Sequence, residues 1–214
     1  MFAVDAIFFD IDGTLVDDRI DIVNAMNYTL RRLGLKEKPP QLIVSYVGAG
    51  VSDLIRKSLG EDKADFTEEG VRLYGDYYIK HPADEARLYP HVKETLEYFR
   101  NKRKLILTNR YAKFAEPVLK KTGIRDYFED VIGGDDENCL KPSACVLDSL
   151  LPRLKIDKAR SIMVGDMAID VMMGKNSGIK TCWVSYGLGR PEEVSELKPD
   201  YTIDDIAKLK KIIK

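Results

Sequence analysis

Five short, mostly apolar runs recur along the chain, and each ends at a small or polar residue. The first covers residues 3–11, and the others cover residues 104–107, 130–132, 161–164 and 180–184. Unbroken apolar runs of this length are typical of strands that are buried on both faces of a parallel sheet. The runs therefore predict strands at these five places.

Apolar residues at helical spacing occupy the segments between these runs. They share one face over residues 92–99, 114–119 and 146–151. Alternating strands and helices predict an α/β fold with a Rossmann-like, doubly wound parallel sheet. The last apolar run, residues 203–213, predicts a terminal helix that packs on this sheet.

One long stretch breaks the alternation, because residues 17–86 carry only helical patterns. Three helices are expected there, over residues 20–33, 51–59 and 71–79. Glycines at positions 34 and 60 follow the first two patterns and are typical helix ends. The sequence thus predicts a core domain formed by residues 1–16 and 87–214, with a small α-helical domain, residues 17–86, inserted into it.

The composition is that of an ordinary globular protein. Of the 214 residues, 34 are basic and 35 are acidic, so the net charge is −1 and no long run of like charge occurs. This balance excludes nucleic acid as the expected partner. The sequence shows neither a basic amino-terminal region with a cleavage site nor an apolar run of about 18 residues, so we expect a cytoplasmic protein without a membrane span.

The three cysteines, Cys139, Cys145 and Cys182, do not form a CxxC pair. An odd number also fits no closed disulfide framework. We therefore expect reduced thiols, as is usual in the cytosol.

Polar residues follow three of the predicted strands. Asp10 and Asp12 end the first run, Thr108-Asn109 follows the second, and Asp166 follows the run at 161–164. Asp170 lies four residues further on, and Lys141 precedes Pro142 in a loop. Ligands of open α/β sheets bind beyond the carboxyl ends of the strands. We therefore expect these side chains to meet at one edge of the sheet.

Four carboxylates gathered at one edge would repel one another, and a single lysine does not balance them. The four are Asp10, Asp12, Asp166 and Asp170. A divalent cation would supply the missing charge, and oxygen ligands favour a hard ion such as Mg²⁺. Because Mg²⁺ takes only a few carboxylates, one aspartate remains free to attack and another to move protons.

The motifs resemble those of the haloacid dehalogenase superfamily of phosphohydrolases. Residues 10–17, DIDGTLVD, are similar to its first motif, and Leu107-Thr108-Asn109 is similar to its second. Lys141-Pro142 resembles the third motif, and residues 164–170 resemble the fourth, GDxxxD. The helical insert looks like the small cap of the phosphoglycolate phosphatase-like branch, and we call it the cap below.

The resemblance implies a role for each acidic residue. Asp10 would attack phosphorus and carry an aspartyl-phosphate, while Asp12 would protonate the leaving oxygen and later accept a proton from water. Asp10, the carbonyl oxygen of Asp12 and Asp166 would bind Mg²⁺, and Asp170 would hold the metal or its waters. The aspartate at position 12 favours phosphoryl transfer, since the dehalogenases place another residue there.

Three further residues are implied to hold phosphoryl oxygens: Thr108, Asn109 through its backbone, and Lys141. The sequence also departs from the pattern of this branch at four positions, which are Arg110, Ser143, Met167 and Ala168. None of these departures falls on an implied catalytic residue, so they affect the choice of substrate more than the reaction.

The sequence therefore predicts a Mg²⁺-dependent phosphatase that hydrolyses a small, phosphoglycolate-like monoester. The expected partner is a small phosphorylated metabolite, and the chain is expected to be a monomer or a homodimer. Two other enzymes of the same superfamily remain open, a phosphosugar mutase and a phosphonate hydrolase that would need a cap lysine. A non-catalytic binding module is a third alternative, although the complete set of motif residues argues against it.

Several cap residues allow two interpretations. Asp17 and Asp18 are expected to cap the first inserted helix or to lie in its hinge. The backbone amides of residues 48–50 either face the site or only form a turn between helices. Arg56 and Lys57 either contact substrate or belong to a solvated helix face.

Overall fold

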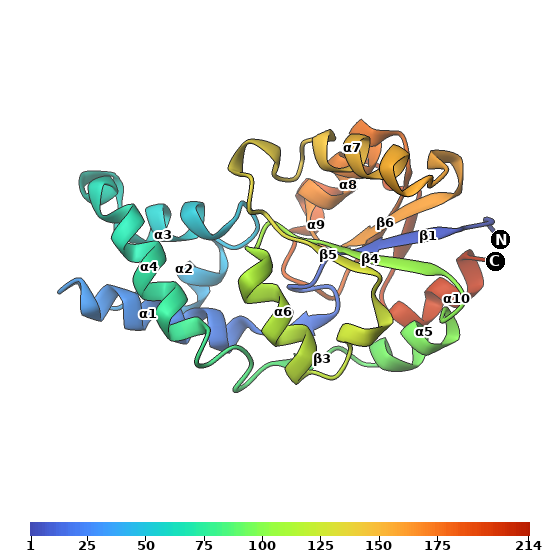
Figure 1. The fold of residues 1–214 in the computed structure, drawn as a ribbon. Coiled ribbons are helices and arrows are strands. Elements are labelled where there is room, and N and C mark those ends of the chain that lie inside the picture. The colour runs from blue at the N-terminus through green and yellow to red at the C-terminus, as the bar shows by residue number, and fades with distance from the viewer.

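The computed structural model describes residues 1–214, and a six-stranded parallel sheet lies at its centre (Figure 1). Its strands are, in spatial order, β5 (Asp130–Ile132), β4 (Arg103–Leu107), β1 (Ala6–Phe9), β6 (Ser161–Gly165), β7 (Lys180–Val184) and β8 (Tyr201–Ile203). All adjacent strands run parallel. The α/β fold and the five predicted strands are confirmed, and β8 is an additional strand.

Helices cover both faces of this sheet, so the sheet is doubly wound as predicted. Side chains alternate along β1: Ile7 and Phe9 join one apolar cluster, whereas Ala6 and Phe8 join another. The first face is covered by α5 (Val92–Tyr98), α6 (Ala112–Lys121) and α10 (Leu209–Ile212), and the second by α7 (Cys145–Leu154) and α8 (Ala168–Ser177) (Figure 1). The short helix α9 (Pro191–Ser195) packs beside α8.

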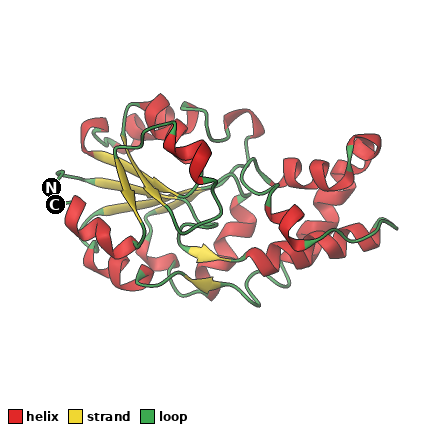
Figure 2. Ribbon diagram, turned by 180° about the vertical axis from the view of Figure 1, so that it is seen from behind, coloured by secondary structure: helices red, strands yellow, loops and turns green.

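Four more helices gather at one end of the molecule (Figures 1 and 2). They are α1 (Arg19–Arg32), α2 (Pro40–Val44), α3 (Val51–Leu59) and α4 (Thr67–Tyr78), and α1 contacts the other three. The three helices expected in this part of the chain are therefore confirmed. The short α2 was not expected; it begins at Pro40, where a missing N–H costs nothing.

Short segments of 3-10 helix complete the connections. They are η1 (Glu61–Phe66), η2 (Arg125–Tyr127), η3 (Glu137–Cys139), η4 (Lys158–Arg160) and η5 (Ile206–Lys208).

A two-stranded antiparallel ribbon lies where the chain enters and leaves this helical group. It pairs β2 (Val16–Asp17) with β3 (Arg87–Leu88) (Figure 2). Both limits predicted for the cap, residues 17 and 86, fall at this ribbon. The division into a core and a cap with these limits stays a prediction.

The predicted terminal helix over residues 203–213 is wrong in its first part. Ile203 is the last residue of β8 and pairs with Val184 of β7. The side chain of Asp205 accepts a hydrogen bond from the backbone N–H of Ala207 at 2.8 Å. Because this bond caps a turn, helical structure begins only at Ile206, and α10 keeps four residues.

None of the helices in the structure combines the length and the apolar character that crossing a lipid bilayer requires.

Replacing a phenylalanine of the central strand tests the packing of this core. Phe8 is fully buried, so Phe8→Ala is expected to lower the free energy of unfolding by about 3–5 kcal/mol. The matched change Phe66→Ala, at a residue that is 50% exposed, should alter it by only about 0.5 kcal/mol. Urea unfolding of both variants is the measurement, and equal losses would contradict the buried position of β1.

Candidate active site

The carboxyl ends of three neighbouring strands bring the first polar residues together. Asp10, Thr108 and Asp166 each follow a strand, β1, β4 and β6 respectively. β1 lies between the other two strands in the sheet, and the N–H of Asp10 donates to the carbonyl oxygen of Val164 at 3.0 Å. The expected meeting of these side chains at one sheet edge follows directly from this strand order.

Lys141 reaches the same place from the loop between β5 and α7. Its Nζ lies 2.8 Å from Asp10 Oδ1 and 2.6 Å from Asp170 Oδ1, and all three side chains are buried. Burial alone would lower the pKa of Lys141, but the carboxylates of Asp10 and Asp170 outweigh it and raise that pKa. Lys141 is therefore a fixed positive charge.

Asp166 is fixed by donors on two loops. Its Oδ1 accepts from Thr14 Oγ1 at 2.8 Å, and its Oδ2 accepts from the backbone N–H groups of Leu188 and Gly189 at 2.7 and 3.2 Å. Gly13 lies against it with φ +83°, and a Cβ there would be only 2.3 Å from Asp166 Oδ2. Only glycine permits this approach, which explains why a glycine follows Asp12 in the motif.

Three of these carboxylates form a cluster that can hold a metal ion. Oxygens of Asp10, Asp166 and Asp170 lie within 4.8 Å of one another. When all three carboxylates are ionised, as metal ligands are, their charges and that of Lys141 sum to −2, which a divalent cation would neutralise. Burial, followed by the charges of Asp10 and Asp170, raises the pKa of Asp166 to about 8. The all-oxygen donor set and its missing positive charge fit a hard divalent ion.

Asp12 does not join this cluster through its side chain. Its Oδ1 lies 2.8 Å from Nη2 of Arg110, and the same nitrogen lies 2.5 Å from Asp18 Oδ2. Burial raises the pKa of Asp12 well above its usual value, although the charge of Arg110 opposes the rise. Lys141 therefore pairs with Asp10 and Asp170, and Arg110 pairs with Asp12, whereas Asp166 is held by neutral donors only.

Two roles were expected for Asp18, to cap the first inserted helix or to lie in its hinge, and the structure contradicts the first. Asp18 occupies the position before α1, but its side chain makes no capping hydrogen bond. Its carboxylate pairs with Arg110 instead. Asp17 forms a partly exposed ion pair with Arg19. The only sequence signal for Arg110 was its departure from the pattern of related motifs.

The side chain of Asn109 links two loops of the site through three hydrogen bonds, which we call the brace. Its Oδ1 accepts from the N–H of Lys141 at 2.8 Å, and its Nδ2 donates to the carbonyl oxygens of Lys141 and Gly48 at 3.0 and 2.9 Å. Thr108 Oγ1 accepts from the N–H of Arg110 at 3.1 Å. The sequence had suggested a phosphate-binding role for the Asn109 backbone, and it gave no sign of this brace.

A small cavity of about 40 Å³ lies between the strand ends and the helical group. Five of the seven predicted site residues line it, namely Asp10, Asp12, Thr108, Asn109 and Lys141, and Arg110 lines it as well. The opposite wall consists of Ile22, Val47, Gly48, Gly50, Val51, Leu54 and Tyr74. Gly48 and Gly50 line this cavity, whereas Arg56 and Lys57 pair with Asp53 and do not line it. A role for the backbone amides of residues 48–50 stays a prediction.

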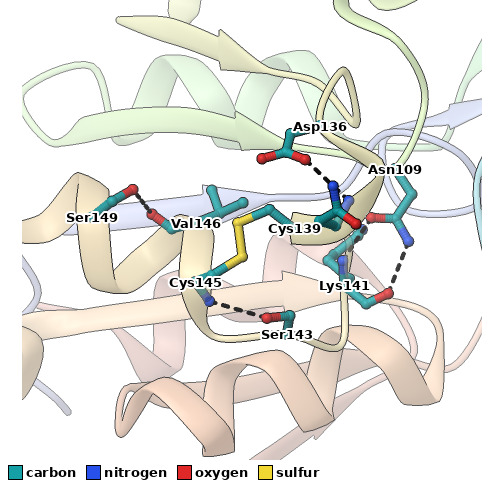
Figure 3. The surroundings of a disulfide bond; sticks show 9 residues. Asn109, Asp136, Cys139, Lys141, Ser143, Cys145, Val146 and Ser149 are labelled. Carbon is teal, nitrogen blue, oxygen red and sulfur yellow. Dashed lines mark hydrogen bonds between the residues drawn. A yellow bond between two sulfur atoms is a disulfide. The ribbon is translucent and has the colours of Figure 1, made fainter.

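The expectation of three reduced thiols is wrong for two of the cysteines. Cys139 and Cys145 form a disulfide with Cα atoms 5.7 Å apart, and only Cys182 is free (Figure 3). The chain turns between η3 and α7, and this turn brings the two cysteines within bridging distance although they do not form a CxxC pair. The closed loop contains Lys141.

Comparison with known proteins identifies the family. A family model described as haloacid dehalogenase-like hydrolase matches residues 7–184, so the chain belongs to this family of hydrolases. The chain is 32% identical to a phosphoglycolate phosphatase of Vibrio parahaemolyticus, with 97% of this chain and 95% of the relative covered. It is also 32% identical to a phosphoglycolate phosphatase of Aquifex aeolicus, with 95% of each chain covered.

A solved structure agrees with this assignment. The crystal structure of a predicted phosphoglycolate phosphatase from Haemophilus somnus 129pt superimposes with a TM-score of 0.91 at 28% sequence identity, and 99% of each chain is covered.

Removing the Asn109 side chain tests the brace. Asn109→Ala would delete three hydrogen bonds and leave the buried N–H of Lys141 without a partner, so we expect a loss of about 2–4 kcal/mol in the free energy of unfolding. The control Asn101→Ala, at an exposed residue, should change it by about 0.5 kcal/mol. Chemical denaturation measures both, and a loss at Asn109 no larger than the control would contradict the brace.

Counting thiols tests the disulfide. Protein purified without reductant and then denatured should show one reactive thiol per chain, because bridged sulfurs do not react as thiols, and three after reduction. Cys182→Ser should show none before reduction and two afterwards. The readout is colorimetric thiol titration, and three thiols in unreduced wild-type protein would show that the bond is absent.

Proposed function

We propose that this protein is a Mg²⁺-dependent phosphatase that hydrolyses a small phosphate monoester through an aspartyl-phosphate on Asp10. The observation that carries the proposal is the position of Asp10. It lines the cavity, lies 2.8 Å from the ammonium of Lys141, and belongs to the acidic cluster that fits a divalent ion. The relatives named phosphoglycolate phosphatase support the same reaction class.

Asp10 is the nucleophile in this proposal. One of its carboxylate oxygens attacks phosphorus and forms an acyl-phosphate bond, while the bond between phosphorus and the ester oxygen breaks. Lys141, with a raised pKa, stays charged and stabilises the negative charge on the phosphoryl oxygens. Thr108 and Asn109 line the same cavity, and in this proposal the Thr108 hydroxyl and the Asn109 backbone hold those oxygens.

Asp12 moves the proton. It gives a proton to the departing alkoxide, so the alcohol leaves neutral, and it then takes a proton from the water that attacks the aspartyl-phosphate. That second step regenerates Asp10 and releases inorganic phosphate. Asp10, Asp166 and the carbonyl oxygen of Asp12 would hold Mg²⁺, with Asp170 holding the metal or its waters, and the bound ion would supply positive charge that offsets the charge of the phosphate group.

The cavity supports a small substrate, a phosphorylated metabolite of the phosphoglycolate class. Its volume of about 40 Å³ corresponds to only a few water molecules. The cap wall carries no charged side chain, so the charged groups that meet the substrate come from the core. This arrangement favours short esters over bulky ones. We propose a monomer or a homodimer for the working form.

The alternative enzymes receive less support. A phosphonate hydrolase would need a cap lysine in the site, and none of the residues that line the cavity from the cap is a lysine. No observation favours a phosphosugar mutase. A cytoplasmic location stays an expectation, and the disulfide between Cys139 and Cys145 weighs against it because such bonds are rare in reducing compartments.

The test is phosphate release from a panel of small esters, including phosphoglycolate and 4-nitrophenyl phosphate. Activity is expected with Mg²⁺ and should disappear with a chelator and return when Mg²⁺ is restored. Asp10→Asn should lower kcat at least about a thousandfold, because the amide cannot attack phosphorus. Acid quenching of the wild-type enzyme with labelled substrate should also trap phosphate on Asp10.

A matched aspartate variant controls for general effects of the substitution. Asp148→Asn removes an exposed carboxylate that pairs with Lys158 far from the cavity, and it should keep wild-type activity. If folded wild-type protein with Mg²⁺ releases no phosphate from any ester, the proposal is wrong.

A further inference from the structure

A buried guanidinium joins three parts of the chain beside the cavity. Arg110 follows β4, and its side chain is 5% exposed. Its Nη2 contacts the carboxylates of Asp12 and Asp18 at 2.8 and 2.5 Å. Its Nη1 donates to the hydroxyl of Tyr78, and its Cζ lies 4.9 Å from the centroid of the Tyr78 ring.

The partners of Arg110 come from opposite sides of the site. Asp12 belongs to the turn after β1, in the core. Asp18 precedes α1, the first helix of the cap, and Tyr78 is the last residue of α4. Both cap partners have fully buried side chains, and the Tyr78 hydroxyl also donates to Asp18 Oδ2 at 3.3 Å. One guanidinium therefore ties the second aspartate of the motif to both ends of the helical insert.

Arg110 leaves one oxygen of Asp12 free. Oδ1 of Asp12 is buried and makes no hydrogen bond, and its 2.8 Å contact with Nη2 of Arg110 is an ion pair, the one such pair that Asp12 makes. Oδ2 contacts no cation, the carboxyl group of Asp18 lies near that of Asp12, and Asp12 lines the cavity. A carboxylate held by one oxygen keeps a single orientation and offers the other oxygen for proton transfer. Without Arg110, rotation of this side chain would be restrained by packing alone.

We infer that Arg110 is a positioning residue that orients Asp12 for proton transfer, and that Asp18 and Tyr78 of the cap hold Arg110 in place. The inference rests on the proposed phosphatase function. In this scheme Arg110 acts through Asp12 and is not a substrate ligand, although it also lines the cavity. A lysine cannot replace it, since a single ammonium lacks the planar fork that reaches these partners together.

The leaving group of the substrate separates this role from a purely structural one. 4-Nitrophenolate departs readily without a proton, whereas an alkoxide needs one from Asp12. In a two-step reaction kcat/KM reports events up to formation of the aspartyl-phosphate, so it isolates the step in which Asp12 acts as an acid. We therefore compare kcat/KM for an alkyl phosphate and for 4-nitrophenyl phosphate in wild-type protein and Arg110→Lys.

Arg110→Lys is expected to lower kcat/KM for the alkyl ester by about tenfold or more and for 4-nitrophenyl phosphate by less than about threefold. Tyr78→Phe removes only the hydroxyl that binds Arg110. It should lower kcat/KM by less than Arg110→Lys does, and again more for the alkyl ester than for 4-nitrophenyl phosphate. The control Arg103→Lys alters an arginine at the opposite end of β4, paired with Glu129, and should leave both values unchanged. Thermal unfolding confirms that each variant is folded.

Two outcomes would overturn the inference. Equal losses for the two esters in both variants would assign Arg110 a structural role only, and wild-type values in both would assign it none. If Arg110→Lys does not fold, Tyr78→Phe alone decides. The quantity compared is then its loss of kcat/KM for the alkyl ester relative to its loss for 4-nitrophenyl phosphate. Wild-type protein that hydrolyses neither ester would instead refute the proposed function, so the two failures are distinguishable.

Discussion

The contact of one ammonium group with two buried carboxylates is the constraint around which the site is arranged. Lys141 Nζ lies between Asp10 and Asp170, and no second cation contacts either of them. To bring Lys141 there, the loop between β5 and α7 must cross the strand ends. The hydrogen bonds of the Asn109 side chain and the Cys139–Cys145 disulfide hold this loop in place. The negative charge that remains after this pairing is what makes the site suitable for a divalent ion.

A second cation, Arg110, gives the two aspartates of the first motif different ion-pair partners. Asp10 and Asp12 are only two residues apart, yet the first pairs with Lys141 and the second with Arg110. The two acids therefore experience different surroundings, one beside the acidic cluster and the other against the ends of the cap. Such a separation suits a pair in which one residue attacks phosphorus and the other moves protons.

The sequence predicted the sheet and the catalytic edge well because both depend on local patterns. Apolar runs mark strands, and polar residues at their ends must meet once the strands are parallel. The missed features depend on distant pairings: Asp18 and Arg110 are 92 residues apart, and no periodicity links them. The donors of Leu188 and Gly189 to Asp166 are backbone N–H groups, which every residue except proline carries, so the residue types do not reveal these bonds. The strand β8 was not predicted, and its last residue, Ile203, was assigned to the terminal helix, because the strand has few apolar residues and its pairing with β7 is tertiary.

The ribbon of β2 and β3 has a consequence for how such proteins diversify. Both covalent connections between the sheet and the helical group pass through this one pair of two-residue strands. An unrelated helical module can therefore be grafted at the same two junctions without altering the register of the sheet. The graft would have to supply one acid and one hydroxyl to satisfy the buried Arg110, so the arginine limits which modules are compatible. Only helical modules that carry an acidic partner for Arg110, and that also fit the shape of the site, would then be compatible with this core.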